Sequence, residues 1–173
     1  MSELEIIFTK QEINRAVKRL AEEVMVDYEG KNPLLIGVLK GALVFMADLI
    51  RLLDMPIDVE FVTPSSYGQG AKETSGKVTM IKGLNTSIGG RDVLLVDDIV
   101  DSGITLNYLL SLVRRKNPNS LRACVMFDKP AKRKVSVKID YTGLTCQDYF
   151  VVGYGLDYCE KYRNLPELYH LVD

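Results

Sequence analysis

The chain has 173 residues, of which 47% are hydrophobic and 26% charged, and its net charge is -1. These values are typical of one soluble globular domain and exclude a broadly basic surface that would grip nucleic acid or anionic membrane. The three cysteines (Cys124, Cys146 and Cys159) are widely spaced, which argues against a disulfide framework or a zinc site and favours a reducing, cytoplasmic location. His170 is the only histidine, so any metal should be a hard cation with oxygen ligands.

The sequence contains no segment that we expect to cross a membrane. Lys40 and Asp48 interrupt the most apolar stretch, 34–50, and a spanning helix needs about 20 mostly apolar residues. The acidic start of the chain lacks the layout of a signal peptide. We therefore expect neither membrane nor nucleic acid among the partners.

The first elements alternate between helix and strand. Thr9 and Glu12 fit a capping box, and the apolar spacing that follows predicts a helix to about Tyr28. Further along, the patterns predict a strand at 34–39, a helix at 41–54, a strand at 57–62 and a strand at 78–81. Between the last two strands, 63–77 is rich in glycine, serine and polar residues. A disordered linker would fit, but we expect a flexible lid because strand-like sequence resumes directly after it.

The second half continues the same alternation. The patterns predict a buried strand at 93–96, a loop at 97–103, a helix at 104–115, a strand at 121–127 and short strands at 135–141 and 149–152. Such an order is typical of an α/β fold with a mainly parallel, twisted sheet flanked by helices. We interpret the short basic run 132–134 as solvated surface.

The segment 93–105 carries the clearest chemical signal. A buried strand ends in Asp97 and Asp98, and a turn of small residues leads into a helix. Ligands bind at the carboxyl ends of strands in such sheets, and the free N–H groups of a helix start hold phosphate. The carboxylates would repel a phosphate, so they fit hydroxyls or a divalent cation. Helix capping alone would explain one acidic residue, but not three within five positions.

This segment resembles the signature of type I phosphoribosyltransferases. Three further motifs resemble the hypoxanthine–guanine phosphoribosyltransferase family: Leu39-Lys40-Gly41, Ser66-Tyr67, and 148–158 followed by Tyr162-Arg163. The four motifs stand in the family's order and spacing, and the similarity runs over most of the chain. The resemblance implies purine salvage, in which phosphoribosyl pyrophosphate and hypoxanthine or guanine give IMP or GMP and pyrophosphate, with Mg²⁺ as cofactor.

The resemblance also implies roles for residues that bind the sugar phosphate. The loop from Asp101 through Ser102, Gly103 and Ile104 to Thr105 would hold the 5′-phosphate, and Asp101 would act as general base near purine N7. Asp97 and Asp98 would contact the ribose hydroxyls. Many family members have glutamate in place of Asp97, whose shorter side chain changes the reach of that contact.

Other matched residues would bind the base, the metal and the pyrophosphate. Purine-binding residues would be Lys129 (to the 6-oxo group), Phe150 (by stacking), Val151, Leu156 and Asp157. The metal would lie near Asp157, with Asp97 and Asp98 contributing through ribose hydroxyls or water. Pyrophosphate would meet Leu39, Lys40, Gly41 and Arg163, where the family often has a cis peptide, and Ser66 and Tyr67 would belong to the lid.

On the same grounds we expect one phosphoribosyltransferase domain over 1–173. Its core would span about 34–129, and a hood would come mainly from 130–173, with the N-terminus as a further candidate part. Members of the family are usually dimers or tetramers, so the resemblance implies a homodimer or homotetramer, with 39–53 as candidate interface. Three alternatives remain open at this point: preference for another oxopurine such as xanthine, a non-catalytic regulator with the same fold, and a signalling receiver domain.

Overall fold

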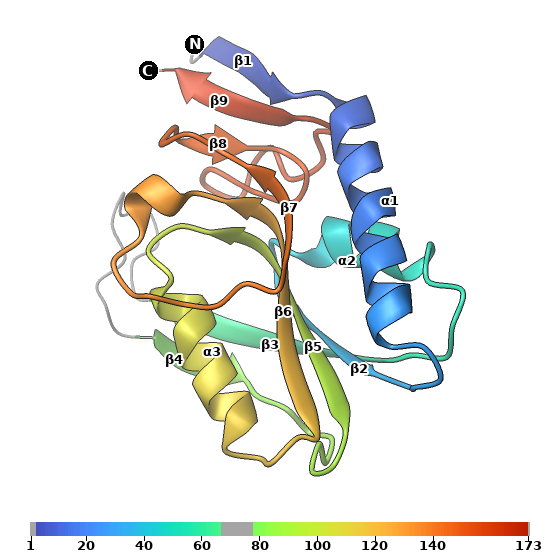
Figure 1. Cartoon of the computed structure of the whole chain (residues 1–173). Coiled ribbons are helices and arrows are strands. Elements are labelled where there is room, and N and C mark those ends of the chain that lie inside the picture. The colour runs from blue at the N-terminus through green and yellow to red at the C-terminus, as the bar shows by residue number, and fades with distance from the viewer. Residues whose placement is uncertain (1–2, 67–77, 173) are drawn as a thin grey trace.

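The computed structural model describes residues 3–66 and 78–172. Its frame is a six-stranded sheet in the order β4-β3-β2-β5-β6-β7 (Figure 1). All neighbours pair in parallel except β4, which runs antiparallel to β3. The predicted mainly parallel sheet is therefore confirmed. Its strands are β2 (Leu34–Val38), β3 (Asp58–Ser66), β4 (Val78–Lys82), β5 (Asp92–Val100), β6 (Ser120–Asp128) and β7 (Tyr141–Thr145).

Helices cover both faces of this sheet. On one face lie α1 (Lys10–Asp27) and α2 (Leu43–Ile50), and on the other lies α3 (Ile104–Arg114) (Figure 1). A short 3-10 turn, η1 (Pro130–Lys132), follows β6. The capping box at Thr9 is confirmed, but the predicted helix 41–54 is too long, because the chain forms turns on both sides of α2. None of the described helices has the length and apolarity needed to cross a bilayer.

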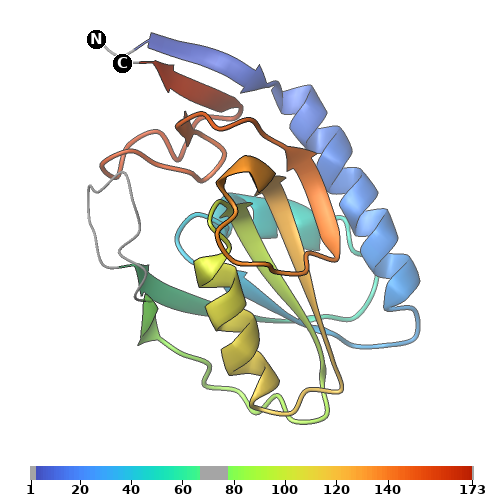
Figure 2. The ribbon, with the colours of Figure 1, turned by 60° about the vertical axis from the view of Figure 1, so that its left-hand side comes forward.

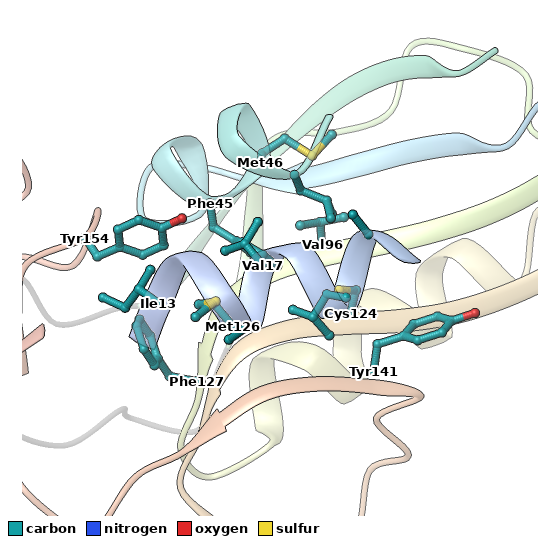
Figure 3. Packing of buried hydrophobic residues seen from close by; sticks show 14 of the residues in the cluster. Ile13, Val17, Phe45, Met46, Val96, Cys124, Met126, Phe127, Tyr141 and Tyr154 are labelled. Carbon is teal, nitrogen blue, oxygen red and sulfur yellow. The ribbon is translucent and has the colours of Figure 1, made fainter. Parts of the chain in front are cut away.

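The apolar runs in the central strands reflect burial on both faces. Successive residues of β5 alternate: Leu94 packs into the cluster that contains α1 and α2, while Leu95 packs into the one that contains α3. Figure 3 shows Ile13 and Val17 of α1 in the first cluster, together with Met126 of β6. Since side chains alternate across a strand, a continuous apolar sequence fills both cores.

A second, three-stranded antiparallel sheet lies over the carboxyl ends of the large one (Figures 1 and 2). Its order is β1-β9-β8, with β1 at Glu3–Phe8, β9 at Leu168–Val172 and β8 at Val151–Val152. β1 and β9 were not predicted. They come from the two ends of the chain, and their pairing is not visible in any local sequence window.

Several predicted boundaries are wrong. β5 continues to Val100, so the acidic pair lies within a strand and not in a loop, because parallel pairing with β6 persists to Asp128. β3 runs to Ser66 and takes up the first residues of the segment expected to be a lid. The side chain of Ser66 and residues 67–77, including Tyr67, lie outside the described residues. No strand forms over 135–140, and the predicted strand 149–152 forms only at 151–152.

Candidate active site

A cavity of about 570 Å³ lies where β5 and β6 end. Its walls come from the β5–α3 loop, from the segment after β6, and from the loop around β8. Most predicted site residues line it, namely Asp97, Asp101, Ser102, Gly103, Thr105, Lys129, Phe150, Val151, Leu156 and Asp157. Among the described residues with predicted roles, the lining does not include Leu39, Lys40, Gly41, Asp98, Ile104 or Arg163.

The loop into α3 is built for close approach of an anion. Gly103 has φ +81°, and a Cβ there would lie 2.7 Å from the Val135 carbonyl oxygen. Only glycine fits this conformation in this space. The Ile104 amide donates to Ser102 Oγ at 3.3 Å, and the first turn of α3 presents further N–H groups at the positive end of the helix dipole. The loop therefore suits a phosphate group.

Asp97 and Asp98 form a buried acidic pair. Asp97 is only 5% exposed, and burial raises its pKa well above the usual value, with the neighbouring Asp98 charge adding to the effect. Burial also raises the pKa of Asp98, while its hydrogen bonds to Asp97 and to the Ile99 amide oppose that shift. A Cβ on Gly41 would lie 1.6 Å from Asp98 Oδ2. Asp97 is thus shielded from water, and Asp98 lies against the backbone at Gly41.

Lys129 and Asp101 face each other across the cavity floor. Lys129 is 3% exposed, its ammonium donates to the Tyr149 carbonyl at 2.7 Å, and it lies 3.4 Å from Asp101 Oδ1. That oxygen is buried and accepts no hydrogen bond from the described residues. Lys129 is thus not a solvated surface lysine, and both groups keep bonding capacity for a ligand.

Residues predicted to meet pyrophosphate lie beside the cavity. The Leu39–Lys40 peptide bond is cis, and the Lys40 ammonium pairs with Glu160 at 2.9 Å on the surface. Arg163 donates to the Gly155 carbonyl at 2.8 Å and pairs with Asp157 at 2.6 Å. Arg163 Nε is buried without a hydrogen-bond acceptor among the described residues. This side of the site therefore combines two cationic groups with the acidic Asp157.

The interpretation of 132–134 as solvated surface is confirmed for Lys134, which is exposed, but it is incomplete, because Lys132 and Arg133 are half-buried and all three residues line the cavity. Arg133 donates through Nε to the Asp101 carbonyl at 3.1 Å and pairs with Asp128. The Lys134 amide donates to the Ser102 carbonyl at 2.9 Å. The segment therefore forms the second wall of the anion-binding loop. A basic run directly after the carboxyl end of a buried strand was the available signal.

The donor set fits a magnesium ion that is completed by substrate. The described residues contain no cluster of three or more acidic, cysteine or histidine side chains ready to bind a metal. The predicted metal residues Asp97, Asp98 and Asp157 supply only oxygen ligands. Mg²⁺ is typically held by one or two carboxylates together with substrate oxygens and water.

Comparisons with known proteins agree with this geometry. A family model for the phosphoribosyl transferase domain matches residues 3–159. Hypoxanthine-guanine phosphoribosyltransferase from Bacillus subtilis is 48% identical over 161 residues, 93% of this chain and 89% of that protein. A bifunctional TilS/HprT protein from Listeria innocua is 46% identical over the same share of this chain, which spans only 25% of that longer protein.

Solved structures give the same result. A hypoxanthine-guanine phosphoribosyltransferase from Bacillus anthracis has a TM-score of 0.92 and 40% identity, covering 98% of this chain and 100% of that one. A hypoxanthine phosphoribosyltransferase from Staphylococcus aureus has a TM-score of 0.91 and 41% identity, covering 96% and 90%. With matched sequence, fold and site order, the chain belongs to the phosphoribosyltransferase family, among the hypoxanthine-guanine phosphoribosyltransferases.

Proposed function

We propose that this chain transfers the 5-phosphoribosyl group from phosphoribosyl pyrophosphate to hypoxanthine or guanine, giving IMP or GMP and pyrophosphate. One observation carries the proposal: a single cavity holds an anion-binding loop, a carboxylate with free bonding capacity and a buried lysine. The relationship to hypoxanthine-guanine phosphoribosyltransferases supports the same substrates.

The loop 101–105 binds the 5′-phosphate through its backbone N–H groups and the Ser102 and Thr105 hydroxyls. Asp97 and Asp98 accept hydrogen bonds from the ribose 2′- and 3′-hydroxyls, which relieves the repulsion within the pair. Asp157 would help to hold Mg²⁺, with Asp97 and Asp98 as further oxygen donors near it. When bound, this ion neutralises charge on the pyrophosphate and makes it a better leaving group.

The base lies between Phe150 and the loop into α3. Phe150 is 39% exposed, enough to offer a ring face to a purine. Val151, Leu156 and Asp157 line the edge of the base, and Lys129 donates to its 6-oxo group. Adenine carries an amino donor at that position and would leave the ammonium unpaired, which is a strong basis for discrimination.

Asp101 acts as the general base. As purine N9 forms its bond to ribose C1, the purine must lose the proton on N7, and Asp101 Oδ1 accepts that proton because no described group already donates to it. The same negative charge stabilises the oxocarbenium-like sugar as its bond to pyrophosphate breaks. The backbone at Leu39, Lys40 and Gly41, with Arg163, receives the departing pyrophosphate, while a lid that includes Ser66 and Tyr67 excludes water.

The same proposal extends to the assembly of the protein. One domain spans 1–173, with a core at about 34–129 and a hood from 130–173 joined by the N-terminal strand, and it works in the cytoplasm. A homodimer or homotetramer forms through 39–53. In support, Leu43 and Leu52 on this segment are 54% and 44% exposed, so the segment offers apolar surface to a partner subunit.

A nucleotide-formation assay tests the activity. Phosphoribosyl pyrophosphate and Mg²⁺ are supplied with hypoxanthine, guanine, xanthine or adenine, and EDTA serves as the control. We expect nucleotide from hypoxanthine or guanine, none from adenine, and none with EDTA. Turnover mainly of xanthine would refute the assigned base. Binding of phosphoribosyl pyrophosphate without turnover of any base would favour a regulator. In Lys129→Ala, we expect the preference for oxopurines over adenine to be lost.

A further inference from the structure

The buried Lys129 forms its hydrogen bond to a part of the chain that has little regular structure. Its ammonium donates to the Tyr149 carbonyl, and 146–150 between β7 and β8 is neither helix nor strand. The Tyr149 amide bonds only locally, to the Gln147 carbonyl at 2.9 Å. The position of the Tyr149 carbonyl therefore depends on what holds this segment from outside.

Asp148 is held by an ion pair with Lys132 at 3.0 Å, and the support for Tyr149 itself comes from β9. The ring of Tyr149 stacks on the ring of His170, with centroids 4.6 Å apart and planes 28° from parallel. One residue further along each segment, the Leu171 amide donates to the Phe150 carbonyl at 2.9 Å. β9 thus holds Tyr149 by a ring and Phe150 by a backbone bond.

His170 is itself held on both sides. It is paired with Val151 of β8 and with Glu5 of β1, and its Nδ1 lies 3.8 Å from a Glu5 carboxylate oxygen. The small sheet therefore supports segment 146–150, which includes the Tyr149 carbonyl that binds Lys129. Contacts of this kind hold a binding group in one position.

We propose that His170 is a positioning residue for the purine pocket. Its ring fixes Tyr149, whose carbonyl holds the Lys129 ammonium where a 6-oxo group docks. This inference rests on the proposed function, because it takes Lys129 as the group that contacts the base. Binding of a base to Lys129 should consequently change the environment of the His170 ring, although His170 does not line the cavity.

The first test uses the fact that His170 is the only histidine, so its imidazole C–H signals stand alone in the NMR spectrum of untagged protein. Addition of IMP should shift these signals, whereas ribose 5-phosphate, which lacks the base, should leave them nearly unchanged. Calorimetry confirms binding of each ligand. In Tyr149→Leu, IMP should still bind, but the shift should disappear.

The outcomes separate the two proposals. If IMP binds and the His170 signals do not move, the positioning role is wrong while the proposed function stands. If ribose 5-phosphate causes the same shift as IMP, the signal does not report the base and the role is again wrong. If IMP does not bind, both proposals fail.

The second test is kinetic. His170→Leu should raise the KM for hypoxanthine roughly fivefold, the scale of a lost ring–ring contact, and leave the KM for phosphoribosyl pyrophosphate unchanged. His170→Phe, which keeps an aromatic ring, should restore the value. Tyr169→Phe is the matched control on the same strand, because it loses only the hydrogen bond from the hydroxyl to Glu167. Equal changes in both KM values, without rescue by phenylalanine, would show a merely structural role and overturn the proposal.

Discussion

The carboxyl groups at the two ends of strand β5 have pKa values that are shifted in opposite directions. At the amino end, Asp92 accepts hydrogen bonds from Ser120 at 2.6 Å and Asn119 at 2.9 Å, and the bond from Ser120 is the main cause of its lowered pKa. At the carboxyl end, burial raises the pKa values of Asp97 and Asp98. The two strands thus carry a carboxyl with a lowered pKa at one end and two carboxyls with raised pKa values at the other.

The amino end also ties α1 to the sheet. Tyr141 of β7 donates to Asp27 at the end of α1 at 2.6 Å, and Arg122 of β6 donates to both of them. The hydrogen bond from Tyr141 is the main cause of the lowered pKa of Asp27. At this end hydrogen bonds lower the pKa values of Asp27 and Asp92, whereas at the carboxyl end burial raises those of Asp97 and Asp98. The comparison separates groups that stabilise the fold from groups that bind and react.

The largest expected effect is on catalysis at the carboxyl end. Asp101→Asn keeps the size of the side chain but removes the proton acceptor. We expect kcat to fall by roughly 100- to 10,000-fold, the usual range for a general base, with little change in melting temperature. Steady-state kinetics and calorimetric unfolding measure the two quantities. Near-full turnover with normal substrate binding would show that Asp101 is not the base.

Substitutions of Gly103, after the carboxyl end of β5, and of Gly90, before its amino end, test the difference between the two ends. In Gly103→Ala, the left-handed backbone and the overlap with the Val135 carbonyl should lower the free energy of unfolding by about 1–3 kcal/mol. They should also raise the KM for phosphoribosyl pyrophosphate. Gly90, just before β5, has φ +73° but no atom within 4 Å of an added Cβ. Gly90→Ala should cost only about 1 kcal/mol and leave KM unchanged. Urea unfolding and kinetics on both variants check this, and equal KM effects would refute the anion-binding role of the loop.

The parts of the site that could be predicted from the sequence are those with a local sequence signal. Asp97 and Asp98 stand out because an apolar run ends in charges, and this signal is local. The loop at Gly103 is likewise readable, since small residues lead directly into a helix. The wall at 132–134 was missed, because a basic run facing solvent and one facing a ligand have the same composition. Only its place directly after the carboxyl end of a buried strand distinguishes it.

Contacts between segments that are distant in the sequence could not be predicted, for a different reason. β1 and β9 are defined by their pairing across almost the whole chain, and the stack of Tyr149 on His170 exists only because that pairing brings β9 to the pocket. Local patterns do not encode such partners. The reactive groups were therefore easier to predict than the residues that position them.

A smaller effect is expected from neutralising the buried acidic pair. Because the folded-state pKa of Asp97 is raised, its protonated form favours folding below the unfolded pKa of about 4, and this contribution is lost as pH rises through the folded pKa. Asp97→Asn resembles the protonated form. We expect it to raise the free energy of unfolding by about 1–2 kcal/mol at pH 7, with the gain shrinking toward pH 4, and to weaken binding of phosphoribosyl pyrophosphate. Urea unfolding across this pH range measures the gain, and a destabilised variant at pH 7 would contradict it.

The smallest effect is expected at the amino end, with the opposite sign. Tyr141→Phe removes the hydroxyl that donates to Asp27, so the pKa of Asp27 should return toward its ordinary value. A carboxyl with a lowered pKa stabilises the fold above its unfolded pKa and loses that contribution as pH falls. We expect a loss of about 0.5–1 kcal/mol at pH 7, kept small because Asp27 and Arg122 are partly exposed. The loss should shrink on acidification, and kcat should stay unchanged. Urea unfolding should therefore show Tyr141→Phe and Asp97→Asn approaching the parent stability from opposite sides as pH falls, since folding lowers the pKa of Asp27 and raises that of Asp97.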